Sequence, residues 1–187
     1  MHSQPPSRPL ESLSGLIERV SPSQYTQALI RQKSFTAAQW LKRCDELAAQ
    51  QPVLFFELLT FSRDGVPENI FRRLIDYLSV LQFATKASSE SIAAPISLPE
   101  FQAATERTGK FFYAITTDDP AHFVRMMEAW FAGVMEKSDP LVWAGCVEVL
   151  CSSGMKEQPL FKEMVITLAS IADAYASRLQ QEIHSAK

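Results

Sequence analysis

Histidine is the side chain that proteins use most often for proton transfer near neutral pH and for metal binding. The chain of 187 residues contains three histidines. His2 and His184 lie close to the ends of the sequence, so only His122 falls within a region of regular apolar spacing. Asp118 and Asp119 lie near it in sequence, but they precede a proline, where carboxylates cap the first turn of a helix. His122 is therefore a candidate catalytic or metal-binding residue, although a solvent-exposed histidine in a first helical turn is the simpler interpretation.

The known catalytic and metal-binding motifs are missing from the sequence. No Glu-x-x-His, His-Glu-x-x-His or Cys-x-x-Cys spacing occurs, which argues against a di-iron bundle, a zinc protease and a redox cysteine pair. The six glycines are isolated, so the chain lacks phosphate-binding loops and the Gly-x-Ser-x-Gly turn of α/β-hydrolases. The sequence predicts no cofactor and no metal, and it favours a protein without enzymatic activity.

Two glutamates stand alone within strongly apolar segments. Glu57 interrupts the apolar run at residues 53–61, and Glu148 interrupts the run at residues 141–151. A helix that is apolar on every face is usually buried, and a buried carboxylate needs a cation or hydrogen-bond donors, or else it stays protonated. If both glutamates face one interior cavity, they would bind a cationic ligand or transfer protons.

A simpler interpretation is that each glutamate marks the narrow wet strip of a mostly buried helix. Glu57 shares a helical line with Gln50 and Asp64, which lie two turns away on either side and favour this interpretation for Glu57. Glu148 is different, because its face carries small and apolar residues: Leu141, Ala144 and Gly145. We therefore expect Glu148 to be buried.

Helices are the elements that have to position these residues. Apolar side chains recur at helical spacing over most of the chain, and no stretch alternates apolar and polar residues as a half-buried strand does. Prolines open many of these runs, Ser97 and Glu100 form a capping box before another, and Gly65 and Gly154 are the expected stops of two. The predicted helices span residues 10–20, 23–32, 36–50, 52–63, 67–86, 98–115, 120–136, 140–152 and 158–183.

These elements predict an all-α protein, an irregular helical bundle or a stack of α-hairpins with about eight or nine helices. Residues 1–9 are rich in proline and serine, and we expect them to form a disordered tail. Residues 10–187 are expected to form a single all-helical domain. Within it, the small and polar residues of 86–96 predict a mobile loop that joins two helical halves.

Composition and charge argue against several classes of protein. The net charge is −3 with mixed signs, so no basic stripe is available for nucleic acid. The longest strongly apolar stretch, at residues 52–61, is about half as long as a membrane span, so we predict no membrane insertion. The three cysteines have no metal-ligand spacing, and the N-terminus lacks the apolar core of a secretory signal. Both observations predict a cytoplasmic protein with free thiols.

Two of the predicted helices leave candidate contact residues outside their apolar stripes. Tyr113 falls on the polar side of helix 98–115, and Met126, Ala129 and Gly133 form a flank of helix 120–136. Ala129 and Gly133 are small enough to let another helix approach closely, either within the fold or from a second chain. These four residues are our candidate interaction surface.

Two functions from different classes fit the sequence. The one we favour is a non-enzymatic protein–protein interaction or regulatory module, whose partner is another protein or a second copy of the chain. The alternative is a small-molecule-binding protein or an enzyme with an interior pocket between helices. That pocket would use Glu57, Glu148 or His122.

Overall fold

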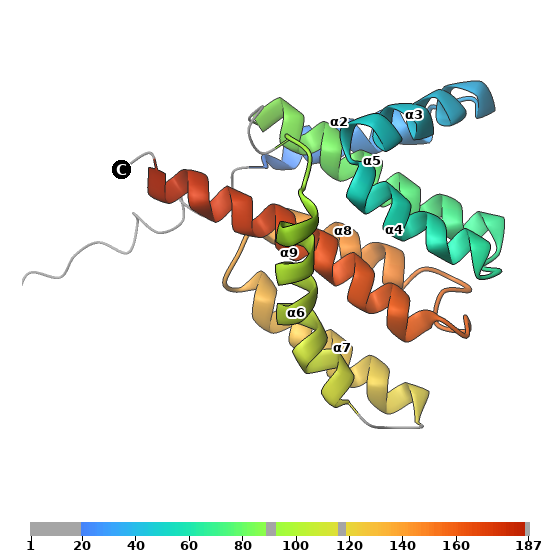
Figure 1. Ribbon diagram of the computed structural model, residues 1–187, viewed down its shortest axis with the longest axis vertical. Helices are drawn as coiled ribbons and strands as arrows, with labels where there is room; N and C mark the ends of the chain where they lie inside the picture. Colours follow the sequence, from blue (N-terminus) through green and yellow to red (C-terminus); the bar gives the residue numbers. More distant parts are fainter. Residues whose placement is uncertain (1–19, 89–92, 116–118, 186–187) are drawn as a thin grey trace, which may run out of the picture.

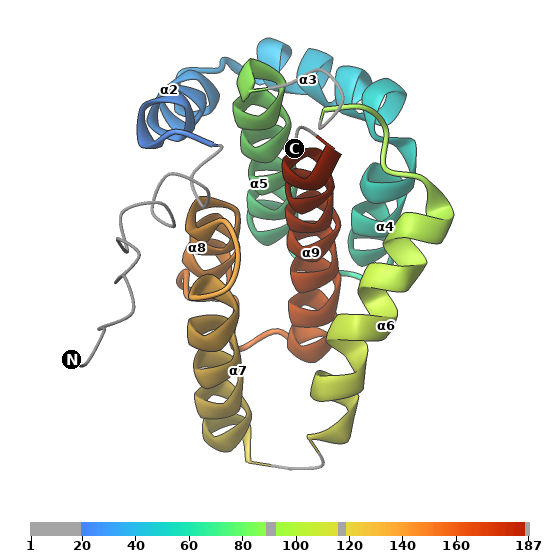
Figure 2. The same cartoon turned by 90° about the vertical axis from the view of Figure 1, so that its left-hand side faces the viewer.

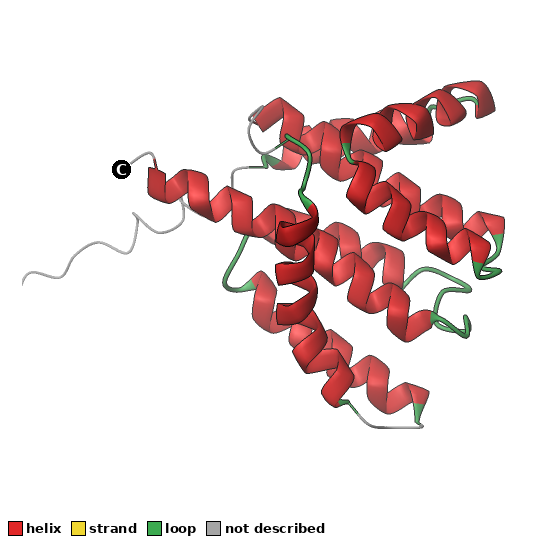
Figure 3. Ribbon diagram, in the orientation of Figure 1, coloured by secondary structure: helices red, strands yellow, loops and turns green. Residues whose placement is uncertain are grey.

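The computed structural model describes residues 20–88, 93–115 and 119–185, and all regular secondary structure in them is α-helical (Figure 3). The predicted tail at 1–9 and nearly all of the predicted helix at 10–20 lie outside the described residues. The helices that the structure describes are α2 (Pro22–Lys33), α3 (Ala37–Gln50), α4 (Pro52–Arg63), α5 (Glu68–Ser88), α6 (Leu98–Ala114), α7 (Pro120–Met135), α8 (Pro140–Leu150) and α9 (Phe161–Ser185). The all-α prediction is confirmed, and each of these helix ends lies within one turn of its predicted position.

Local capping explains where the helices begin. The predicted capping box at Ser97 and Glu100 is present at the start of α6. Asp119 and Asp139 cap α7 and α8, each accepting a hydrogen bond from the N–H of the second residue of its helix, because the first residue is a proline. These side-chain oxygens satisfy N–H groups that have no partner within the helix, so the sequence alone specifies these starts.

Two prolines lie outside the helices that we expected them to open. Pro67 precedes α5, and its carbonyl accepts hydrogen bonds from the N–H groups of Ile70 and Phe71. Pro159 lies in a turn before α9, in which the N–H of Phe161 donates to the carbonyl of Gln158. The helices therefore begin one or two positions after these prolines.

The turn after α4 shows why Gly65 stops this helix. Gly65 has φ of 86°, which L side chains rarely adopt, and Gly154 likewise has φ of 81°. At Gly65 the N–H of Val66 donates to the carbonyl of Phe61, and both side chains are buried. This is the Schellman arrangement, so the predicted stop is confirmed at Gly65. Gly154 lies in the turn after α8, which already ends at Leu150 with Cys151 as its C-cap.

Helix α9 runs through the middle of the molecule, with α4, α6 and α8 packed against it (Figures 1 and 2). Its side chains are buried almost continuously from Met164 to Leu179. Helix α5 packs along α2 on one side and against α4 and α8 on others. An aromatic cluster joins α6, α7 and α8, with Trp130 within 6.0 Å of the rings of Phe111, Phe112 and Trp143.

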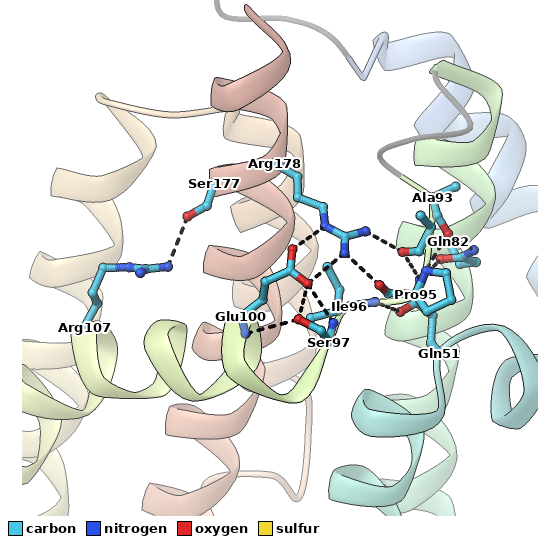
Figure 4. A network of polar contacts seen from close by, with 11 residues as sticks. Gln51, Gln82, Ala93, Pro95, Ile96, Ser97, Glu100, Arg107, Ser177 and Arg178 are labelled. Atoms are coloured by element: carbon cyan, nitrogen blue, oxygen red, sulfur yellow. Dashed lines mark hydrogen bonds and ion pairs between the residues drawn. The ribbon is translucent and has the colours of Figure 1, made fainter. Parts of the chain in front are cut away.

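The connection between α5 and α6 is held at its described end by side chains from other helices (Figure 4). Gln51 accepts a hydrogen bond from the N–H of Ile96 and donates to the carbonyls of Ala93 and Ala94. Gln82 also donates to the carbonyl of Ala93, and accepts from Gln51. Helix α5 continues two residues beyond its predicted end at 86, because it extends to Ser88.

Arg178 on α9 completes this arrangement. Its guanidinium donates to the carbonyls of Ala94 and Pro95 and forms an ion pair with Glu100 at 2.9 Å. We call Gln51, Gln82, Glu100, Arg178 and the backbone of residues 93–97 the loop latch. Residues 89–92 lie outside the described residues, so mobility there stays a prediction, whereas residues 93–96 are fixed by these bonds.

Candidate functional site

A hollow of about 500 Å³ opens between α2, α5 and α8. Such a volume lies within the range of small-molecule pockets, about 300–1,000 Å³. We call it the α2–α5–α8 hollow. Its apolar walls come from five side chains: Tyr25, Leu29, Tyr77, Val80 and Val149. Its remaining lining residues are Gln32, Lys33, Arg73, Asp76, Gly145, Glu148, Ser152 and Ser153.

Helices α5 and α8 form two walls of the hollow and run antiparallel. Arg73 donates to the carbonyl of Ser153 at 3.1 Å, and the hydroxyl of Tyr77 donates to the carbonyl of Val142 at 3.1 Å. Burial raises the pKa of Tyr77 well above its usual value. These two hydrogen bonds, made at different positions along α5, therefore fix how α5 and α8 are aligned.

Gly145 lets Tyr25 lie directly against α8. A Cβ atom at position 145 would overlap the hydroxyl of Tyr25 and would lie 3.1 Å from the ring of Tyr77. The pKa of Tyr25 is raised to about 12, first by burial and then by the charge of Glu148. Among the described residues, the hydroxyl of Tyr25 has no hydrogen-bond partner. It is a polar group at the hollow that the fold leaves unsatisfied.

Asp76 on α5 is held by one of its two carboxylate oxygens. Its Oδ1 accepts hydrogen bonds from Nε2 of Gln32 at 2.6 Å and from Nε1 of Trp40 at 2.8 Å. Burial raises the pKa of Asp76, while these two bonds and the charge of Arg72 lower it. Its Oδ2 accepts no hydrogen bond from the described residues. Asp76 thus keeps one acceptor free at the hollow.

A buried chain of hydrogen bonds leads to Gln32, which donates to Asp76. The hydroxyl of Ser79 donates to Gln32 at 2.7 Å and accepts from Nε of Arg43 at 2.9 Å. The guanidinium of Arg43 lies 3.9 Å from the ring centre of Phe83, and its Nη2 is the one buried side-chain nitrogen or oxygen of the described residues without a hydrogen-bond partner. This chain orients Gln32 and therefore the carboxylate of Asp76.

Glu148 lines the α2–α5–α8 hollow, but our expectation that it is buried is wrong. The structure exposes Glu148, together with Ala144 and Cys151, which lie one turn away on either side. The apolar character of this face misled the prediction, because Ala144 is small and lies on the outer strip of α8. No hydrogen bond or ion pair from the described residues reaches the carboxylate of Glu148.

The three sequence candidates do not share a site. Glu57 is partly buried and lines a separate hollow of about 290 Å³ between α4, α6 and α9, so it does not meet Glu148. His122 is exposed on α7 and lines neither hollow. Among the described residues, no group of three or more His, Cys, Asp or Glu side chains is arranged to hold a metal ion.

The candidate interaction residues fall in two places. Tyr113 is 65% exposed and lines the hollow of Glu57, to which α7 contributes no described residue. On α7, Met126 packs partly against the core, whereas Ala129 is exposed. A Cβ atom at Gly133 would meet nothing within 4 Å. Hence no helix of the described chain packs closely on this glycine.

Sequence reasoning missed Asp76 and Tyr25, although Asp76 carried a signal. It stands alone between Ile75 and Tyr77 in an apolar stretch of α5, which is the same pattern that singled out Glu57. Tyr25 carried no comparable signal, because an aromatic residue on a short helix is ordinary core material.

Carboxylates and a phenol with unused hydrogen-bonding capacity, set among apolar walls, are suited to binding and orienting a ligand. The lining contains no histidine or cysteine, and the hydroxyl of Ser152 donates to the carbonyl of Val149. Among the described residues, no hydroxyl of the lining is hydrogen-bonded to a carboxylate that could serve as its base. No described helix is long and apolar enough to cross a membrane. Comparisons with protein-family models, with curated proteins and with solved structures gave no match for this chain.

Proposed function

We propose that this protein binds a small molecule in the α2–α5–α8 hollow without transforming it. The observation that carries the proposal is a hollow of ligand size whose polar groups Tyr25, Asp76 and Glu148 keep unused bonding capacity. Polar groups that line a hollow without bonds to the rest of the chain are free to bond a ligand, and the apolar walls beside them favour its apolar part.

Mapping of fragment binding by NMR tests this function. We expect a subset of small fragments to shift the amide resonances of residues lining the hollow, and Val149→Phe to reduce this binding by filling space. Val124→Phe is the matched control, because Val124 is also a partly buried valine packed against the core but lies on α7, outside the hollow. The proposal fails if no fragment shifts the hollow resonances, or if both variants reduce binding equally.

A second candidate function is the interaction module that the sequence favours. The observation in its favour is the open flank of α7, where Ala129 is exposed and Gly133 has nothing within 4 Å of its missing Cβ. Light scattering of the purified protein tests self-association. A monomer at all concentrations, with no change on Gly133→Leu, would leave this flank without support as a contact between copies.

The cellular setting is part of the same proposal. Cys44, Cys146 and Cys151 are free thiols, which supports the predicted cytoplasmic location because reducing compartments keep thiols unpaired. A cytoplasmic protein with this hollow would meet soluble metabolites directly. Fractionation of cells that express the protein checks this location.

A further inference from the structure

The free hydrogen-bonding groups of the α2–α5–α8 hollow include three acceptors, beside the N–H donors of Lys33 and Arg73. Oδ2 of Asp76 comes from α5, the carboxylate of Glu148 from α8 and the hydroxyl of Tyr25 from α2. Ionised carboxylates accept hydrogen bonds but donate none, and a phenol oxygen accepts as well as donates. A ligand that satisfies all three has to bring several donors, and a positive charge makes those bonds shorter and stronger.

Two cations also line the hollow, but they do not neutralise these carboxylates. Arg73 directs Nη1 to the carbonyl of Ser153, and neither Arg73 nor Lys33 forms an ion pair with a described carboxylate. The one cation that acts on the pKa of Asp76 is Arg72, which is not a lining residue. The carboxylates of Asp76 and Glu148 therefore have no ion-pair partner among the described residues and remain available to a ligand.

The walls favour an apolar body on the same ligand. Leu29, Val80 and Val149 are aliphatic, and Tyr25 and Tyr77 line the hollow with them. Aromatic faces attract ammonium and guanidinium groups in addition to apolar surface. The aliphatic and the aromatic walls thus both favour a cation that carries an apolar group.

We infer that the α2–α5–α8 hollow takes an organic cation, namely a primary amine or guanidinium carried on a small aliphatic or aromatic body. This inference rests on the proposed binding function and specifies its ligand class. In the complex, the ammonium donates to Oδ2 of Asp76 and to the carboxylate of Glu148, and the hydroxyl of Tyr25 accepts a third bond. The apolar body lies against Val80 and Val149.

Titration calorimetry with three probes of similar size tests the ligand class. The probes are 2-phenylethylamine, which is a cation at pH 7, the neutral 2-phenylethanol and the anionic 3-phenylpropanoate. We expect the amine to bind about tenfold more tightly than the alcohol, because charge-assisted hydrogen bonds are stronger than neutral ones. The anion should bind more weakly than the alcohol.

Variants locate the charge that binds the amine. Asp76→Asn keeps an oxygen for Gln32 and Trp40, and we expect it to weaken amine binding about tenfold. Glu148→Gln should weaken it about threefold, because this carboxylate is exposed and screened by water. The control is Glu57→Gln, which removes the same charge from a different hollow and should leave the affinity unchanged. Should Asp76→Asn fail to fold, the pair of glutamate variants still decides the question.

The outcomes separate this inference from the function on which it rests. If the alcohol or the anion binds as well as the amine and shifts the hollow resonances, the cation class is wrong and the binding function stands. If Glu57→Gln weakens amine binding as much as Glu148→Gln, only the overall charge matters and the site assignment is wrong. If no probe and no fragment shifts the hollow resonances, the binding function itself fails.

Discussion

The loop latch and the α2–α5–α8 hollow are two polar clusters in the same helical body, and they differ in how fully their groups are bonded. In the latch, Gln51, Gln82 and Arg178 use every side-chain nitrogen and oxygen, and both carboxylate oxygens of Glu100 accept bonds. In the hollow, Tyr25, Asp76 and Glu148 retain groups that no described residue satisfies.

This difference separates residues that stabilise the fold from residues whose hydrogen-bonding groups remain available to a ligand. Removing a polar group from water costs free energy, and in the latch that cost is offset within the chain by hydrogen bonds to the backbone of residues 93–97. In the hollow, the unbonded groups of Tyr25, Asp76 and Glu148 are not buried without a partner, so they add no such bonds to the fold. Changes in the latch should therefore alter stability, and changes to these unbonded groups should mainly alter ligand binding.

The largest effect is expected for Arg178→Ala. The side chain of Arg178 is 14% exposed, and its loss removes the donor of the Pro95 carbonyl and the charged donor of both Glu100 and the Ala94 carbonyl. We expect the free energy of unfolding to fall by about 3 kcal/mol, as measured by chemical denaturation. Arg107→Ala is the control, because the ion pair of Arg107 with Asp173 also joins α6 to α9 but Arg107 is 50% exposed. This variant should cost less than about 1 kcal/mol. Equal losses would contradict the distinction.

A second prediction compares two glycines inside helices. Gly145→Ala places a methyl group against the hydroxyl of Tyr25, and we expect a loss of about 2 kcal/mol in unfolding free energy from this overlap. Gly133→Ala meets nothing within 4 Å and should instead gain about 0.5–1 kcal/mol from helix propensity. Adding Tyr25→Phe to Gly145→Ala should recover part of the loss, because the overlapping hydroxyl is then absent. A stabilising Gly145→Ala would show that Tyr25 does not lie against α8.

The pH dependence of stability should report the latch. The pKa of Glu100 is lowered from 4.5 to about 2, first by its hydrogen bonds to Arg178 and then by those to Ser97, against the opposing effect of burial. A lowered folded-state pKa means that this contribution is complete above pH 4.5 and is lost as the pH falls toward about 2. Because the side chain of Glu100 is 40% exposed, we expect only about 1 kcal/mol.

Denaturation between pH 5 and pH 2 measures this contribution, with Glu100→Gln as the variant that lacks it. In the Arg178→Ala background, Glu100→Gln should change the loss of stability at low pH only a little, because the main cause of the lowered pKa is already gone. If Glu100→Gln leaves the loss of stability at low pH unchanged in the wild-type background, the ion pair adds no stability.

The helices could be predicted because their signals are local in sequence. The capping box of Ser97 and Glu100 and the stop at Gly65 involve residues within one turn of each helix end. Each signal acts on backbone groups a few positions away, so the sequence contains both sides of the interaction. The packing of side chains between helices has little influence on the positions at which these helices end.

The hollow could be predicted only in part, because its residues meet through packing. Glu148 was singled out as a lone acid, but its exposure and its separation from Glu57 depend on which strip of α8 faces outward. Tyr25 reaches the hollow because Gly145, far away in sequence, leaves room for its hydroxyl. Asp76 shows the same pattern as the two glutamates, so that pattern identifies polar residues near the core without indicating which of them lie together.

The smallest expected effect, and the closest test of the comparison, is the removal of one hydroxyl that bonds to the loop latch and of one that lines the hollow. Tyr175→Phe deletes a buried hydroxyl that donates to Gln82 at 2.7 Å, and we expect a loss of about 1 kcal/mol in unfolding free energy. Tyr25→Phe deletes a hydroxyl with no partner among the described residues, so the change should be within about 0.5 kcal/mol of zero. The same substitution should weaken amine binding, because the hydroxyl of Tyr25 then no longer accepts a bond from the ligand. If Tyr25→Phe instead destabilises the protein as much as Tyr175→Phe, the hydroxyl of Tyr25 supports the fold, and the hollow is not a site left open for a ligand.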